Sequence, residues 1–364
     1  MDGSYYLKES VGVRKSRLFI LSLLSAAIIS GCSDKEQVQE PEKEVEQVNA
    51  ETEVDVEVSE ELPYVTPFTG VRVAEEVSTR PILATINNHP QARPQSGLAA
   101  ADVVYEMLAE GDVTRFLALY QSEVPDSIGP IRSARSYFID IAAGLDAFYI
   151  AHGYSPEAKS MLDRRVVDQI NGMQYDGTFF TRSSERKAPH NSYITGENVM
   201  AGAEKVGASL LYQKKVSYPF YEAEDSVKIG AAANEVTMMY NRGGSFNSHY
   251  VYDAETNHYK RYSANVETID AETNESIELA NVLFFEMPHR IIDSEGRRDI
   301  TITDGGNAYV AQAGTVREVK WKNADGLLVA VEEDGTEVKL VPGNTWIHFV
   351  PTTPGLATAV TYSE

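Results

Sequence analysis

The most apolar stretch of the chain lies near its N-terminus, over residues 18–29 (LFILSLLSAAII). Arg14, Lys15 and Arg17 precede it, and the chain turns strongly polar directly after Cys32. A basic cluster, a short apolar run and small residues at its end are the layout of a secretory signal. These twelve residues are fewer than the roughly 20 that a permanent membrane span needs. The pattern predicts a signal peptide over residues 1–32.

The end of this segment, Ile29-Ser30-Gly31-Cys32, resembles the bacterial lipobox, in which the cysteine receives a diacylglycerol and becomes the new N-terminus. Cys32 is the only cysteine in the chain, and a lone thiol in an exported protein needs a reason. We therefore expect acylation (palmitate among the chains) at Cys32, which anchors the protein to the extracytoplasmic face of the cell membrane. The alternative is an ordinary buried thiol after an ordinary signal.

An acidic segment follows, over residues 33–62. Twelve acidic residues and two lysines lie between Asp34 and Glu61, without any aromatic residue. Such a composition cannot bury enough apolar surface to offset the entropy of ordering, and like charges extend it. We expect a disordered tether here, although a charged amphipathic helix is an alternative.

From residue 63 to about 225, runs typical of strands and of helices alternate. Glu110-Gly111-Asp112 separates two apolar runs as a hairpin turn does. Ser155 followed by Pro156 and Glu157 is typical of a helix start, as is Thr195 before residues 196–206. The pattern predicts strands at 81–86, 103–108, 115–121 and 147–151, and helices at 133–145, after Ser155 and at 195–206.

From residue 226 to 364, short apolar runs alternate with glycine-containing turns such as Asp304-Gly305-Gly306 and Asp325-Gly326. We predict strands at 236–240, 250–252, 282–286, 300–303, 308–312, 315–321, 327–332 and 345–350, with Trp346 as a core residue of the last. The expected fold class is α+β: a mixed α/β domain over 63–225, then a mostly β domain, sandwich or barrel-like, over 226–364.

The chain carries a formal net charge of −22. This balance argues against nucleic acid as a partner, because binding phosphate backbones requires a basic surface. The sequence contains no glycine-rich phosphate loop, no His-Glu-x-x-His pair and no Gly-x-Ser-x-Gly elbow. We therefore predict neither a cofactor nor a metal site.

Two segments are locally basic in this acidic chain: residues 128–136 and residues 181–191. Guanidinium groups near a helix start suit phosphate or carboxylate, because the helix dipole and free N–H groups add to their charge. A single anion-binding cleft is the resulting hypothesis, with Arg132, Arg135, Arg182, Arg186, Lys187, His190, Asn191, Asn87 and Asn88 as candidate ligand-binding residues.

Simpler explanations exist for each group. Arg132 and Arg135 could pair with Asp102, Glu106 or Asp140 to stabilise the fold, and residues 182–187 could form a solvated loop. His190, His152 and Glu106 are candidates for catalysis if a histidine and a carboxylate lie within hydrogen-bonding reach. Whether the chain is an enzyme stays open at this point.

Several motifs closely resemble the YerB-like lipoprotein family of Gram-positive bacteria. They lie in residues 80–88, 92–98, 101–106, 128–135, 186–191, 288–290 and 342–347, so the resemblance covers roughly residues 65–355. It implies a two-domain extracytoplasmic lipoprotein of unknown function, and therefore no reaction and no catalytic residue.

Two classes of function follow. The first is an envelope lipoprotein that binds an anionic cell-wall component or a protein partner through an Arg/His-lined cleft. The second is a hydrolase or transferase that acts on cell-wall polymer with a His/carboxylate pair in the same cleft.

Overall fold

Strands make up most of the structure, a computed structural model that describes residues 62–222, 227 and 229–364. The predicted signal peptide, Cys32 and the predicted tether up to residue 61 lie outside the described residues. Helices and strands both occur between residues 63 and 225, and strands dominate beyond. The described residues are therefore mostly β with a smaller helical part.

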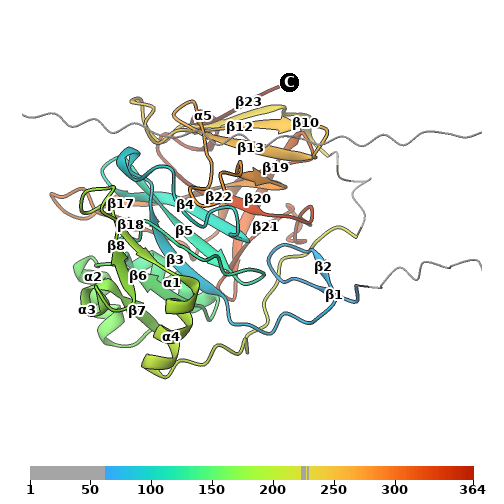
Figure 1. Ribbon diagram of the computed structural model, residues 1–364. Coiled ribbons are helices and arrows are strands. Elements are labelled where there is room, and N and C mark those ends of the chain that lie inside the picture. Colours follow the sequence, from blue (N-terminus) through green and yellow to red (C-terminus); the bar gives the residue numbers. More distant parts are fainter. Residues whose placement is uncertain (1–61, 223–226, 228) are drawn as a thin grey trace, which may run out of the picture. The chain divides into compact units, whose positions relative to one another are not determined.

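A mixed sheet of 11 strands forms the centre of the structure (Figure 1). Five neighbouring strands come from the first half of the chain: β4 (Val103–Glu110), β5 (Val113–Tyr120), β3 (Ile82–Asn87), β6 (Phe148–Ala151) and β7 (Gln169–Asn171). On the other side of β4 the sheet continues with β22 (Thr345–Pro351), β16 (Asn281–Met287), β19 (Gly306–Gln312), β20 (Thr315–Ala324) and β10 (Ala231–Ala232), and β21 (Leu327–Val331) pairs with β20.

The two halves of this sheet meet where β22 runs parallel to β4. Trp346 lies opposite Val104, and His348 lies opposite Glu106. Strands from both sides of residue 225 therefore share one sheet, and the division into domains at that residue stays a prediction from the sequence.

A second sheet of six strands packs on one face of the central sheet. Its strands are β14 (Val266–Glu267), β13 (His258–Ser263), β12 (Ser248–Asp253), β11 (Glu235–Met238), β23 (Val360–Ser363) and β15 (Glu278–Leu279). Val236 and Tyr250 of this layer share a buried cluster with Phe284 and Trp346 of the central sheet. The downstream strands thus do form a sandwich, but one of its layers continues into the upstream strands.

Helices gather around the β6–β7 end of the central sheet (Figure 1). They are α1 (Ser136–Gly144), α2 (Pro156–Asp163), α3 (Gly172–Tyr175) and α4 (Gly196–Val206), while α5 (Leu356–Ala359) lies near β16 and β22. The helix starts predicted from Ser155 and Thr195 are confirmed, since each side chain accepts a hydrogen bond from a first-turn amide. None of the helices in the described part of the chain has the length and apolarity to cross a membrane.

Three two-stranded sheets complete the fold: β1 (Tyr64–Val65) with β2 (Arg72–Val73), β8 (Phe180–Arg182) with β9 (Ser192–Ile194), and β17 (His289–Ile291) with β18 (Arg298–Ile300). Most predicted strands lie within a few residues of observed ones. The strand predicted at 300–303 is an exception, because β18 ends at Ile300.

The two layers are joined by an ion pair that is completely buried. Glu106 of β4 accepts from Arg261 of β13 at 2.9 Å, and both side chains have an exposed fraction of 0%. The indole of Trp346 donates to the same carboxylate at 3.1 Å, and the Arg261 guanidinium lies 4.3 Å from the centre of a Trp346 ring. Burial alone would raise the pKa of Glu106, but Arg261 and the hydrogen bonds hold it below its usual value.

His348 extends this network without adding charge. Burial lowers its pKa to about 3, so the imidazole is neutral although it lies 3.7 Å from Glu106. Its two ring nitrogens bond to the hydroxyls of Tyr240 and Tyr250 at 3.1 and 2.6 Å. Glu106 and Arg261 are therefore the ionised groups of this network.

Truncating Glu106 should destabilise the protein strongly. Glu106→Ala leaves the Arg261 charge buried without its partner, and we expect a loss of about 3–5 kcal/mol in the free energy of unfolding. Urea titration measures it, with Glu123→Ala on the exposed surface as the control. The double variant Glu106→Leu/Arg261→Met should recover part of the loss, because it removes both charges. If Glu106→Ala lowers the free energy of unfolding no more than Glu123→Ala does, the stabilising role of Glu106 is refuted.

Candidate functional site

The carboxyl ends of three neighbouring parallel strands, β3, β6 and β7, meet at one edge of the central sheet. Asn87 ends β3, His152 directly follows β6, and Asn171 ends β7. In open α/β sheets, ligands bind beyond the carboxyl ends of parallel strands. This edge is therefore the first place to look for a site.

The predicted basic segment around Arg132 lies between the ends of β3 and β6. The Asn87 amide donates to the Pro130 carbonyl at 2.8 Å, and the Arg132 amide donates to Thr85 at 2.8 Å. The amide of His152 donates to the Arg132 carbonyl at 2.9 Å. The backbone of this segment is thus bonded to both strand ends, which places the Arg132 side chain at the sheet edge.

Arg132 is the unpaired cation of this edge. Its side chain is half-buried, and its guanidinium has no hydrogen-bond or ion-pair partner within the described ranges. Burial lowers the pKa of Arg132 and Arg135 lowers it further, while Glu110 opposes them. An arginine nevertheless stays charged in proteins, so Arg132 offers its donors to an anion.

Arg135 has a structural partner instead. It forms an ion pair with Glu110, which also accepts from Arg115 at 2.6 and 2.8 Å. Arg135 and Arg115 are both buried. Pairing that stabilises the fold is therefore what the structure shows for Arg135, with Glu110 in place of the expected Asp102, Glu106 or Asp140.

His190 and His89 stack on each other beside this edge, with ring centres 4.5 Å apart. The side-chain amide of Asn87 donates to His190 Nδ1 at 2.8 Å, and the Gln91 backbone amide donates to His89 Nδ1 at 3.2 Å. With Nδ1 as the acceptor in each ring, Nε2 carries the proton. Neither Nε2 has a partner among the residues that the structure describes, so both rings keep a donor for a ligand.

Both histidines are held in the neutral form. Burial lowers the pKa of His89, and so do Arg93 and Arg132. Burial, His89 and Arg132 lower the pKa of His190 in the same way. Arg132 disfavours the protonated form of both rings, so a bound anion would raise both pKa values.

His152 belongs to the same edge but its ring is already bonded. Arg182 donates to Nε2 at 2.9 Å, so Nδ1 carries the proton and donates to the Ser192 hydroxyl at 2.7 Å. The ring lies where a Cβ at Gly172 would come within 2.1 Å of Nδ1, so glycine is required there. Burial and Arg182 lower the pKa of His152, while Asp176 opposes them.

Two of the other basic candidates, Arg182 and Arg186, stabilise loops through hydrogen bonds. Arg182 bonds to Asp176 through Nε and Nη2 and donates to Asn191 at 3.1 Å. Arg186 donates to the carbonyls of Ala92 and Pro94. Lys187 is exposed and has no partner in the described part of the chain. Of the candidates, His190 bonds to Asn87 and stacks on His89, while the Arg132 guanidinium has no partner among the described residues. A single cleft lined by these residues stays a prediction.

Glu106 and Asn88 face away from that cleft. Asn88 donates to Glu106 at 3.1 Å, and Glu106 lies in the buried network with Arg261. Because successive side chains of a strand point to opposite faces, Asn87 and Asn88 lie on opposite faces of the sheet. The expected pairing of Glu106 with His190 or His152 is therefore wrong, and so is the placement of Asn88 in the cleft.

Three residues of these sites were missed as candidates by sequence reasoning. They are His89, Arg93 and Arg261, none of which is among the candidates predicted from the sequence. The signal for His89 was its position two residues after Asn87, on the same side of an extended chain. Arg261 gives no local signal, because its partner Glu106 is distant in sequence.

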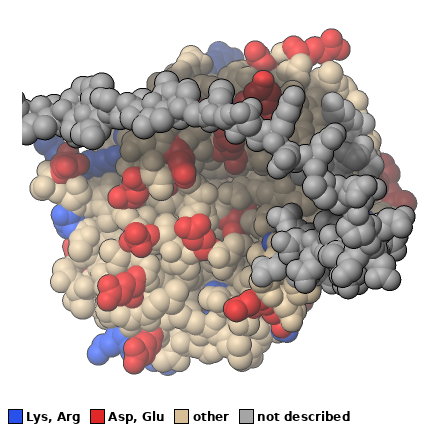
Figure 2. Space-filling model, turned by 45° about the vertical axis from the view of Figure 1, so that its right-hand side comes forward, with Lys and Arg blue, Asp and Glu red and all other residues tan. Residues whose placement is uncertain are grey.

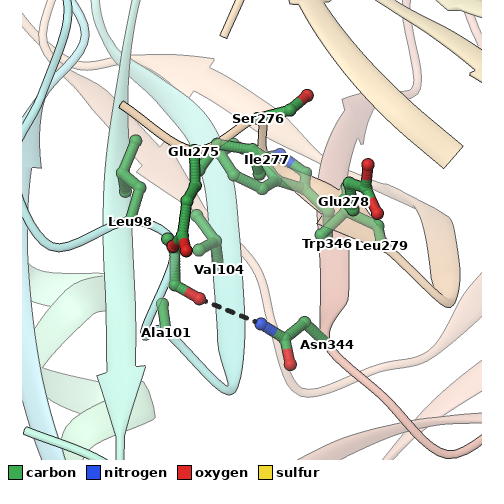
Figure 3. Close-up of a pocket in the computed structure, with 11 residues that line it drawn as sticks. Leu98, Ala101, Val104, Glu275, Ser276, Ile277, Glu278, Leu279, Asn344 and Trp346 are labelled. Carbon is green, nitrogen blue, oxygen red and sulfur yellow. Dashed lines mark hydrogen bonds between the residues drawn. The ribbon is translucent and has the colours of Figure 1, made fainter. Parts of the chain in front are cut away.

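The charged side chains on the face of the molecule shown in Figure 2 are mainly acidic, and they are scattered over it. A separate cavity of about 370 Å³ has apolar walls that include Val104, Ile277 and Trp346, and Glu275 and Glu278 line it as well (Figure 3). The acidic groups make that cavity unsuited to anions.

Fold and site together define a class: a mostly β protein with a mixed central sheet and a compact Arg/His edge. The comparisons with known proteins identify the family. A model described as "Protein of unknown function (DUF3048) N-terminal domain" matches residues 68–209, and its C-terminal counterpart matches residues 236–347. The chain belongs to this family.

A relative from Bacillus subtilis (strain 168), named "Putative lipoprotein YerB", is 40% identical over 293 residues, which are 78% of this chain and 86% of the relative. The crystal structure of the YerB protein from Bacillus subtilis matches with a TM-score of 0.76 and 38% identity, and covers 83% of this chain and 100% of that one. The family resemblance seen in the sequence is thereby confirmed.

Proposed function

We propose that this protein is a lipoprotein anchored through Cys32 on the extracytoplasmic face of the cell membrane, and that it binds an anionic group at the cleft formed by Arg132, His89 and His190. The lipobox-like sequence at Ile29–Cys32 and the name of the Bacillus subtilis relative support the anchor. The acidic segment that follows Cys32 is the tether between the lipid and the folded part.

The observation that carries the binding proposal is the unpaired guanidinium of Arg132. Three arginines lie at this edge, and two of them share Glu110. A half-buried cation without a carboxylate is costly unless a ligand compensates it. A phosphate or carboxylate would accept from Arg132 and from the Nε2 groups of His89 and His190, which are charge-assisted hydrogen bonds.

The ligand class follows from the size and chemistry of this edge. Arg132 and two imidazole donors suit one anionic group rather than a polyanion, and the net charge of −22 disfavours nucleic acid. An anionic cell-wall component fits, with a phosphodiester or a peptide carboxylate as the bound group. An acidic side chain of a protein partner offers the same chemistry.

Replacing Arg132 should abolish most of the anion affinity. Charge-assisted hydrogen bonds contribute about 1.5–3 kcal/mol, so Arg132→Gln should weaken binding by about tenfold or more. Isothermal titration with inorganic phosphate and with a muropeptide measures this. Arg290→Gln is the matched control, because Arg290 is 76% exposed and pairs only with Asp299 in the described structure. Equal affinity in Arg132→Gln and Arg290→Gln would contradict the proposal.

Anion affinity should rise as the pH falls. The surroundings of His89 and His190 lower both pKa values and so favour the neutral form in the free protein, whereas a bound anion would raise both values. Binding of the anion therefore takes up protons. The anion affinity rises as the pH falls through the pKa values that the two histidines have in the complex, and it stops rising below the pKa values that they have in the free protein. Sulfate is the probe, since its charge is constant between pH 8 and 5.5.

The double variant His89→Gln/His190→Gln is the control for this pH dependence. It keeps Arg132 and should bind sulfate with an affinity that hardly changes over the same pH range. A wild-type affinity that is constant with pH, or a double variant with the full wild-type dependence, would exclude the histidines from the site.

Removing the thiol should release the protein from the membrane. Without the Cys32 sulfur no thioether to diacylglycerol forms, so Cys32→Ser should lose incorporation of labelled palmitate and move from the detergent phase to the aqueous phase on Triton X-114 partition. Ser33→Ala, beside it, is the control and should stay lipidated. Unchanged palmitate labelling of Cys32→Ser would overturn the anchor.

A further inference from the structure

A second cavity, of about 450 Å³, has a lining that contains neither Arg132 nor His89 nor His190. The loop from Asn88 to Gln95 forms one side of it, and residues 261–269 of the six-stranded sheet form the other. Its size is within the range of small-molecule sites. Pro90, Pro94 and Ile269 give it apolar walls.

Arg93 supplies a positive charge that no carboxylate of the described residues balances. Its Nε donates to Asn88 at 3.0 Å, and its Nη2 donates to the Ser245 carbonyl at 2.8 Å. Both acceptors are neutral. Burial lowers the pKa of Arg93 to about 10, and the nearby Arg261 contributes, while Glu106 opposes them.

Two further polar atoms in the wall lack partners. Arg261 Nε and Ser263 Oγ are buried, and neither has a hydrogen-bond partner among the described residues. Arg261 is 0% exposed and Ser263 is 5% exposed. Since buried polar groups are nearly always bonded, these two atoms are available to hydrogen-bond with a ligand. Glu267 is the acidic residue of the lining, and its carboxylate accepts from Ser276 at 2.7 Å.

We propose that this cavity binds a small amphiphilic monoanion, an apolar body with one carboxylate, whose carboxylate pairs with Arg93 and whose body lies against Pro90, Pro94 and Ile269. The Arg93 guanidinium, which forms no ion pair, favours a negatively charged ligand. The apolar walls disfavour strongly hydrated ions, because such ions would lose their water on binding. The cavity differs from the Arg132 site in its lining, which includes Arg93 but none of Arg132, His89 and His190.

The test uses the full lipidated chain in lipid nanodiscs, titrated calorimetrically with 2-naphthoate, with empty nanodiscs as the blank. We expect saturable binding to one site, weakened about tenfold or more by Arg93→Gln and to a similar degree when neutral 2-naphthamide replaces the probe. Arg132→Gln should bind 2-naphthoate as the wild type does. Binding lost with Arg132→Gln but kept with Arg93→Gln would assign the probe to the other cleft and overturn the proposal.

A rim variant covers the case in which Arg93→Gln fails to fold. Val266 lines the cavity and is 70% exposed, so Val266→Asp adds a negative charge at the rim without disturbing the core. It should weaken 2-naphthoate binding at least fivefold, whereas Val71→Asp at a distant exposed position should not. No saturable binding to the wild type, or equal binding by both valine variants, would overturn the proposal.

Discussion

The buried ion pair between Glu106 and Arg261 is the interaction on which the rest of the structure depends. It joins the central sheet to the six-stranded sheet at a point where both side chains are completely buried. Such a pair stabilises only when its remaining donors and acceptors are bonded. Asn88, Thr114 and Trp346 complete the shell of the carboxylate, and Trp346 comes from the strand that continues the sheet.

This pair also decides which residues can meet a ligand. It commits Glu106 and Asn88 to one face of β3 and β4, which leaves Asn87 on the other face with His190. Ion pairing also distinguishes the arginines at this edge. Glu110 pairs with Arg115 and Arg135, so Arg132 has no carboxylate partner. Each of the two proposed sites contains a partly buried guanidinium, Arg132 or Arg93, that forms no ion pair within the described structure.

Local features of the fold could be predicted from the sequence, and long-range ones could not. Ser155 and Thr195 mark helix starts because capping depends on neighbouring residues alone. The pairing of β22 with β4 has no local signature, since it joins residues 345–348 to 103–106. For the same reason the sequence pointed to the basic segments but not to the one arginine that is unpaired, nor to Arg261 as the partner of Glu106.

The most direct test of the account is to observe the ring nitrogens of His89 and His190 by ¹⁵N NMR while sulfate is added at constant pH. We expect both rings to shift together from the neutral toward the protonated form. His348, whose pKa burial lowers to about 3, should not change. Ring signals of His89 and His190 that stay constant at saturating sulfate would contradict anion binding at this cleft.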